Sequence, residues 1–255
     1  TDAAETGAFM REWLSLYESK SGERGMFNRQ AAEKQAAKNG RREEYTDYGT
    51  NPCSEIILRN KQFCNLTEVV VRPDDTMESL RTKVEAATIL GTFQATLTNF
   101  RYLTSKWKHN TQEESLLGVS LTGIMDNVDM INGKIDLEYL KNLSVSINKV
   151  WAKKLGIPQS AAITCVKPSG TVSQLVNSAS GIHTRHSPYY LRTIRADKKD
   201  PLARLMVDAG VYYEDDVTKP EHTYVFYFPI KSPKGSLTRK DFTAIEHLEI
   251  WKQYQ

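Results

Sequence analysis

The chain has 255 residues, of which 40% are hydrophobic, and this content is enough to bury the core of one large domain. Its 34 Lys and Arg residues nearly balance its 31 Asp and Glu residues, so the net charge of +3 is too small to indicate a nucleic-acid or membrane surface. No apolar run is long enough to span a membrane, no secretory signal is visible, and three cysteines do not make a disulfide scaffold. We therefore expect a cytoplasmic protein with no nucleic-acid or membrane partner.

The first third of the chain predicts two helices, followed by a loop that leads into a strand. Apolar residues recur at helical spacing over residues 5–17, and an Ala- and Lys-rich stretch over residues 30–42 predicts a second, exposed helix that Gly40 closes. Gly49 and Pro52 then exclude a helix, whereas the TEVVV sequence further on predicts a strand.

The middle of the chain predicts helices that alternate with buried strands. The expected elements are a helix from about residue 77 to 103, a buried strand within 116–126, a helix at 137–155 and a buried strand at 160–166. Asp75 or Thr76 is the expected N-cap of the first helix, and Val84 and Leu90 are expected among its buried side chains.

The last third of the chain is less regular. Its HTYVFYFPI sequence predicts a strand at 222–230, and residues 237–254 predict a terminal helix capped by Thr238. Taken with the alternation before it, this pattern favours a largely parallel α/β architecture, and buried strands such as 160–166 suit a barrel.

Three chemically useful residues, Asn51, Cys53 and Glu55, stand two positions apart at the head of an extended segment. This spacing can place all three side chains on one face, because alternate side chains of an extended chain point the same way. A thiol flanked by a carboxylate and an amide can abstract hydrogen, transfer protons and orient a sugar hydroxyl. The three residues are therefore candidates for a reaction centre.

The other two cysteines differ in their surroundings. Cys64 follows Cys53 by eleven residues, and a returning loop can bring the two sulfurs near each other. A free cysteine is most often a small buried hydrophobe, so that interpretation stays open for both thiols. Cys165 lies inside the predicted strand at 160–166, and we assign it to the core.

The sequence KPSGTVSQL at 167–175 follows a predicted strand and opens a possible helix. Such junctions bind phosphate, because free N–H groups at a helix start point outward with a favourable dipole. The sequence is not a P-loop, and an ordinary capped helix start is the alternative interpretation. The candidate phosphate-binding residues are Ser169, Gly170, Thr171, Val172 and Ser173.

His183 and His186 have a spacing that a metal can use, but no further ligands stand nearby, and we expect no metal.

Together, these motifs resemble those of one family. NPCSEI at 51–56, FCNLTEVV at a fixed interval after it, and CVKPSGTVSQLVNSASGIHTRHSPYYLR at 165–192 are similar to the adenosylcobalamin-dependent, class II ribonucleotide reductases. The resemblance implies a ten-stranded α/β barrel, in which a central finger loop lifts a radical-bearing cysteine to the substrate. It also implies that residues 1–255 are a fragment of this barrel, without the N-terminal half and the C-terminal tail of the enzyme, and inactive by themselves.

The resemblance gives the candidate residues their roles. Cys53, as a thiyl radical, would take the ribose 3′ hydrogen, Glu55 would exchange a proton with the 3′ hydroxyl, and Asn51 would hydrogen-bond the sugar. Cys64 would belong to the cysteine pair that delivers reducing equivalents and ends as a disulfide, with its partner on an early barrel strand outside this chain. The implied cofactor is adenosylcobalamin. The implied partners are a ribonucleotide, with triphosphates favoured over diphosphates, the missing N-terminal part and a thioredoxin-type reductant.

Two alternatives remain open. A class I large subunit shares the barrel and the Asn-x-Cys-x-Glu pattern but takes its radical from a separate metal-containing subunit, and NPCSEI and KPSGTVSQL favour class II over it. A non-catalytic nucleotide-binding module could keep the fold without the reaction. The retained Asn51, Cys53 and Glu55 argue against that second alternative.

Overall fold

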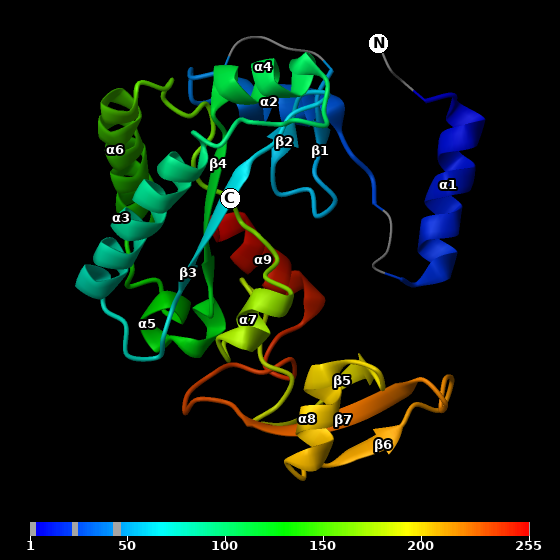
Figure 1. Ribbon diagram of the computed structural model, residues 1–255. Coiled ribbons are helices and arrows are strands. Elements are labelled where there is room, and N and C mark those ends of the chain that lie inside the picture. Colours follow the sequence, from blue (N-terminus) through cyan, green and yellow to red (C-terminus); the bar gives the residue numbers. More distant parts are fainter. Residues whose placement is uncertain (1–3, 22–24, 43–46, 255) are drawn as a thin grey trace.

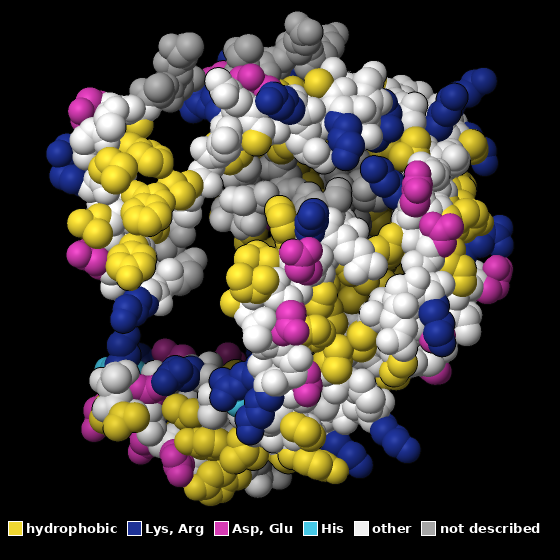
Figure 2. Space-filling model, turned by 180° about the vertical axis from the view of Figure 1, so that it is seen from behind, with side chains coloured by type: hydrophobic (Ala, Val, Ile, Leu, Met, Phe, Trp, Pro, Cys, Tyr) yellow, Lys and Arg dark blue, Asp and Glu magenta, His cyan; other side chains and the backbone are white. Residues whose placement is uncertain are grey.

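The structure is a computed structural model that describes residues 4–21, 25–42 and 47–254. Within these residues, helices and a parallel strand pair form the larger part, and an antiparallel sheet lies at the opposite end (Figure 1). Helix α1 (Thr6–Ser19) stands to one side of both. Figure 2 shows hydrophobic side chains on the surface of this separate helix, and Phe9, Trp13 and Tyr17 are among those exposed.

Parallel strands form the layer on which the candidate site is built. Strand β3 (Asn65–Val70) pairs in parallel with β4 (Leu117–Thr122), with Leu66 opposite Gly118. On the other side of β4, the predicted strand at 160–166 is reduced to a single parallel bridge, between Thr164 and Val119. The predicted strands therefore lie side by side, and the α/β class is confirmed.

Two long helices cover this layer. Helix α3 (Met77–Gln94) is capped by Thr76, which forms a capping box with Ser79, and α6 (Leu137–Leu155) packs beside it. Gly156 ends α6 in the left-handed region at φ 69°, as its sequence predicts. The prediction for α3 is partly wrong, because the helix ends at Gln94 and Leu90 is exposed, although Val84 is buried.

The antiparallel sheet contains β5 (Tyr189–Asp197), β7 (Thr223–Lys231) and β6 (Tyr213–Asp215), in that spatial order. Helix α8 (Pro201–Asp208) lies between β5 and β6 in the chain. The strand predicted at 222–230 is confirmed as β7. The terminal helix, α9 (Ala244–Tyr254), begins later than predicted because Thr238 donates from its N–H and its hydroxyl to Asp241 in a turn that precedes the helix.

The remaining elements are short. They are α2 (Arg29–Ala37), β1 (Gly49–Thr50), β2 (Ile57–Leu58), α4 (Ser105–Glu114), η1 (Ile124–Asp126), α5 (Val128–Ile131) and α7 (Thr171–Leu175). The main core lies between the strands and α3, and α9 returns to pack against it through Ile250 and Tyr254. In the part of the chain that the structure describes, no helix has both the length and the apolar character needed to cross a bilayer.

Candidate active site

A tight hairpin carries the three residues predicted to share one face of an extended segment. Strands β1 and β2 pair antiparallel, and residues 51–55 form the turn between them, with Ser54 in the left-handed region at φ 62°. The extended geometry predicted for this segment is therefore wrong. The turn is closed by Asn51, whose Oδ1 accepts a hydrogen bond from Ile56 N at 3.1 Å.

The turn separates a buried carboxylate from an open thiol. The side chain of Glu55 is only 1% exposed, whereas Cys53 is exposed. The Asn51 side chain lies close enough to the Glu55 carboxylate to lower its pKa. The turn therefore brings Asn51 and Glu55 together, whereas the prediction relied on strand alternation.

An ion pair joins this hairpin to the KPSG sequence. Lys167 Nζ donates to Glu55 Oε1 at 2.9 Å. Burial raises the pKa of Glu55, but the Lys167 ammonium and the Asn51 amide outweigh it and hold that pKa below its ordinary value. The other carboxylate oxygen, Oε2, is buried and has no hydrogen-bond partner within the described residues. The site therefore holds an ionised carboxylate whose second oxygen has no partner among the described residues.

The turn after Lys167 has a second polar atom without a partner. Ser169 is buried, and its Oγ finds no hydrogen-bond partner among the residues that the structure describes. A Cβ placed on Gly170 would meet no described atom within 4 Å, and Thr171 and Val172 are exposed. The turn is therefore exposed from Gly170 to Val172, while the Ser169 hydroxyl lies buried beside it.

One predicted phosphate ligand is corrected by the structure. The Ser173 hydroxyl is buried and donates to the carbonyl oxygens of Ser169 and Gly170, each at 2.8 Å. A serine near a helix start commonly bonds back to a preceding carbonyl in this way. The hydroxyl of Ser173 is therefore used inside the turn and is not directed toward a ligand.

Residues further along the chain pack against Lys167 and against Asp126, which follows β4. Gly181 lies at φ 55°, and a Cβ there would stand 2.7 Å from Lys167 O, so the close approach requires glycine. Arg185 donates two hydrogen bonds to Asp126, at 2.9 and 2.7 Å, with both side chains 2% exposed. Neither Asp126 nor Arg185 was a sequence-based candidate. For Asp126, the sequence does offer a signal, because this carboxylate ends an apolar run from Leu116 to Asp126.

The two remaining thiols meet beneath the hairpin. Cys64 and Cys165 pack against one hydrophobic cluster that contains Ile56, directly after the turn. Burial, and then the charge of Glu55, raise the pKa of Cys64 above its ordinary value. Burial raises the pKa of Cys165 to about 12, with smaller contributions from Glu55 and Cys64. Cys165 is partly buried against this cluster, beside the core to which the sequence assigns it, and its position near Cys64 was not predicted from the sequence.

Metal ligands do not gather in the described part of the chain. No group of three His, Cys, Asp or Glu side chains there is arranged to hold a metal ion. His183 instead contacts the ring of His247 edge to face, at 5.2 Å between centroids.

Comparisons with known proteins place this geometry in context. No protein-family profile matches the chain. An adenosylcobalamin-dependent ribonucleoside-triphosphate reductase of Euglena gracilis is 27% identical over 208 residues, which are 79% of this chain and 28% of the relative. A reductase of the same description from Lacticaseibacillus paracasei is 28% identical over 250 residues, 86% of this chain and 33% of the relative. The chain spans about a third of the length of these curated relatives.

Solved structures agree with the sequence comparison. A crystal structure of a B12-dependent, class II ribonucleotide reductase matches 74% of this chain and 30% of its own chain, with a TM-score of 0.60 and 26% identity. The alpha subunit of a class Id ribonucleotide reductase from Actinobacillus ureae matches 80% and 44%, with a TM-score of 0.55 and 16% identity, which is a likeness in fold alone. The resemblance carried by the motifs is confirmed: the chain is related in sequence and in fold to the adenosylcobalamin-dependent, class II ribonucleotide reductases.

Proposed function

We propose that this chain forms part of the active site of a ribonucleotide reductase that makes 2′-deoxyribonucleotides from ribonucleoside triphosphates. The observation that carries the proposal is the ion pair between Glu55 and Lys167. It fastens the hairpin with the exposed thiol of Cys53 to the strand end from which the turn at 169–173 begins. A reactive sulfur, an ionised carboxylate and an open anion-binding turn thus belong to one site.

The groups of the hairpin suit the first steps of the reaction. The Cys53 sulfur, as a thiyl radical, takes the hydrogen atom from the ribose 3′ carbon and becomes a thiol. Glu55 Oε2, which is ionised and unpartnered within the described residues, accepts the proton of the 3′ hydroxyl while Asn51 orients the sugar. Water then leaves from the 2′ carbon.

Reducing equivalents come from Cys64. This thiol and a second cysteine, outside this chain, together give two electrons and two protons to the dehydrated sugar and become a disulfide. The 3′ hydrogen then returns from Cys53 and restores the thiyl radical. A thioredoxin-type reductant reopens the disulfide for the next turnover.

Adenosylcobalamin supplies the radical when it is bound. The described residues fit that requirement at one point, because the exposed Cys53 sulfur is accessible from outside the hairpin. Within this chain, the remaining task of the protein is to hold the substrate. Ser169 and the backbone around Gly170 bind its phosphates, with Thr171 and Val172 beside them.

The same proposal places the chain in a larger architecture. Strands β3 and β4 belong to a ten-stranded barrel, together with the segment that bridges to β4 at Thr164. The hairpin at 49–58 is the finger loop of this barrel. Residues 1–255 are then a fragment of this barrel, and the rest of the protein completes it and contributes the partner of Cys64. We expect the chain alone to show no sustained turnover, and the complete protein to act in the cytoplasm.

The test is a reductase assay on the complete protein with a ribonucleoside triphosphate, adenosylcobalamin and a dithiol. Cys53→Ala should reduce deoxyribonucleotide formation to background, because no other group can take the 3′ hydrogen. Cys165→Ala is the matched control, since it removes a sulfur from the core, and it should keep most of the activity. Tritium exchange from the 5′ carbon of adenosylcobalamin should be seen with the wild type, and its absence would favour a class I protein. Formation of product by Cys53→Ala would refute the proposal.

A further inference from the structure

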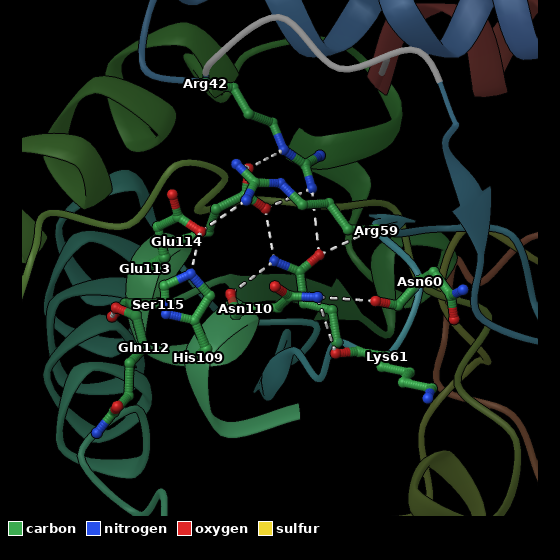
Figure 3. Close-up of polar contacts among 11 residues, drawn as sticks. Arg42, Arg59, Asn60, Lys61, His109, Asn110, Gln112, Glu113, Glu114 and Ser115 are labelled. Carbon is green, nitrogen blue, oxygen red and sulfur yellow. Dashed lines mark hydrogen bonds and ion pairs between the residues drawn. The ribbon is translucent and has the colours of Figure 1, made fainter. Parts of the chain in front are cut away.

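A buried carboxylate away from the reacting groups holds the base of the hairpin (Figure 3). Glu114, the last residue of α4, is 4% exposed. Its oxygens accept hydrogen bonds from Arg42 Nε at 2.8 Å, Arg42 Nη2 at 2.7 Å and Gln62 Nε2 at 2.6 Å, and Arg59 Nη2 lies 3.0 Å from its Oε1. Both oxygens thus accept hydrogen bonds, and together they form a two-pronged contact with the Arg42 guanidinium.

The two arginine partners of Glu114 reach the two ends of the hairpin, Arg59 directly and Arg42 through the ring of Tyr48. Arg59 directly follows Leu58, the last residue of β2. Arg42 lies over the ring of Tyr48, with its guanidinium carbon 4.7 Å from the ring centroid, and this fully buried tyrosine directly precedes β1. One carboxylate therefore binds the chain where it enters the hairpin and where it leaves it.

Amide groups lock the exit of the hairpin to α4. Gln62 Oε1 accepts a hydrogen bond from Arg59 N at 2.8 Å, while its Nε2 contacts Glu114. Asn110 Nδ2 donates to Asn60 O at 2.8 Å. The turn after β2 is thus fixed through its backbone as well as through its charges.

The carboxylate of Glu114 is charged in spite of its burial. Burial raises its pKa, but hydrogen bonds from Arg42 and Gln62 and the charges of Arg42 and Arg59 outweigh that effect, and the pKa lies below its ordinary value. Removing one charge from such a buried group leaves its partners without compensation. Loss of the Glu114 charge would therefore leave Arg42 and Arg59 without their buried counter-charge.

The hairpin depends on this anchor because it has little structure of its own. Its strands, β1 and β2, contain two residues each, and a hairpin of this size is not stable by itself. At its tip, the hairpin is held by the ion pair between Glu55 and Lys167. At its base, Glu114 holds it.

We propose that Glu114 is a positioning residue for the reaction, which sets where the hairpin presents the Cys53 sulfur. The catalytic part of this inference rests on the proposed function, whereas the anchoring can be measured without it. Glu114 touches neither substrate nor reacting atoms in this account. Its effect on the rate passes entirely through the position of the hairpin.

Hydrogen exchange of the full chain, followed by mass spectrometry, tests the anchoring. In Glu114→Gln, amides of residues 49–58 should exchange at least about tenfold faster, while those of β3 and β4 keep their rates. Glu113→Gln is the matched control, because the neighbouring carboxylate is 38% exposed and binds Arg59 from outside. It should change hairpin exchange by less than about twofold. Unchanged hairpin exchange in Glu114→Gln would overturn the proposal.

A milder variant covers the case in which Glu114→Gln does not fold. Gln62→Met keeps the volume of the side chain but removes its hydrogen bonds to Arg59 N and Glu114. Hairpin exchange should then rise by about threefold or more. Wild-type exchange rates in this variant would contradict the anchoring as clearly as in the first.

Kinetics of the complete protein test the catalytic consequence. In Glu114→Gln, kcat should fall by about a hundredfold with KM changed by less than about twofold, because the thiol is displaced while the phosphate turn is untouched. Glu114→Asp, which keeps the charge, should recover part of kcat. A loosened hairpin with normal kcat would overturn the positioning role. Absence of reductase activity in the wild type would instead refute the proposed function and leave the exchange result standing.

Discussion

Glu55 and Lys167 are 112 positions apart in the chain, and their side chains meet at 2.9 Å. The contact joins the tip of the hairpin at 49–58 to the start of the turn at 168–173. Cys53 and Ser169 each lie two residues from a member of the pair, so the contact brings their two segments together. The thiol of Cys53 is exposed, and the Ser169 hydroxyl has no hydrogen-bond partner among the described residues. The proposed chemistry requires this arrangement.

Removing the cation should change the pH dependence of the reaction. In Lys167→Met, burial of Glu55 remains but its main compensating charge is lost, so its pKa should rise. The carboxylate then takes up a proton at a higher pH, and the acidic limb of the pH–rate profile should move upward by the same amount. Lys198→Met, which breaks a pair with Asp215 in the antiparallel sheet, should leave the profile in place. An acidic limb at the wild-type position in Lys167→Met would show that Glu55 is not the titrating group.

The three thiols should differ strongly in their reaction with iodoacetamide. At pH 8, a thiol with a pKa of about 12 is ionised in only about one molecule in ten thousand, so Cys165 should be the slowest. Cys64 should come next, because its pKa is raised and it is half-buried, and the exposed Cys53 should react first. Peptide mass spectrometry over time measures the order. Labelling of Cys165 as fast as Cys53 would contradict the burial of that sulfur.

The sequence predicts local structure well where a helix or strand carries its own signals. Helix α6 begins and ends where predicted, because an apolar period fills it and Gly156 stops it. Helix α4 was not predicted, since its sequence SKWKHNTQEE contains a single apolar residue and shows no amphipathic period. Its polar side chains Asn110 and Glu114 are buried against the hairpin exit instead.

The candidate site was predictable as separate motifs but not as an assembly. Cys53 and Glu55 stand out locally, as does the turn at 169–173. Their connection through Lys167 leaves no local signature, because the partner lies far along the chain. The inward bond of the Ser173 hydroxyl is a matter of side-chain rotation within a short helix, which residue type does not decide.

Close packing under the hairpin makes a glycine necessary. A Cβ on Gly118 would stand 2.5 Å from Leu66 Cδ2, 3.0 Å from Ile56 Cδ1 and 3.1 Å from Cys165 Sγ. Gly118→Ala should therefore lower the free energy of unfolding by about 1–3 kcal/mol in urea titrations. Gly49→Ala is the control, because a Cβ there would meet no described atom within 4 Å, and its effect should stay below that range. Equal stability of the two variants would contradict the packing of Ile56 on β4.

The buried pair of Asp126 and Arg185 should contribute more to stability than an exposed pair nearby. Asp126→Asn leaves the Arg185 charge uncompensated in a buried position, so the free energy of unfolding should fall by about 3–5 kcal/mol. Asp129→Asn, which breaks an exposed pair with Lys134, should cost about 1 kcal/mol or less. Urea unfolding followed by circular dichroism gives both values. If the two substitutions lowered the free energy of unfolding equally, the buried pair would be no more stabilising than the exposed pair.

Affinity labelling of the complete protein tests whether the Cys53 thiol and the turn at 169–173 contact one substrate molecule. The reagent is a ribonucleoside triphosphate analogue with a thiol-reactive group on its ribose. The label should be found on Cys53, excess ribonucleoside triphosphate should prevent it, and Gly170→Trp, which fills the open turn, should slow it strongly. Labelling of Cys53 that is unaffected by competing nucleotide and by Gly170→Trp, or labelling confined to Cys165, would show that the thiol and the turn do not serve one substrate.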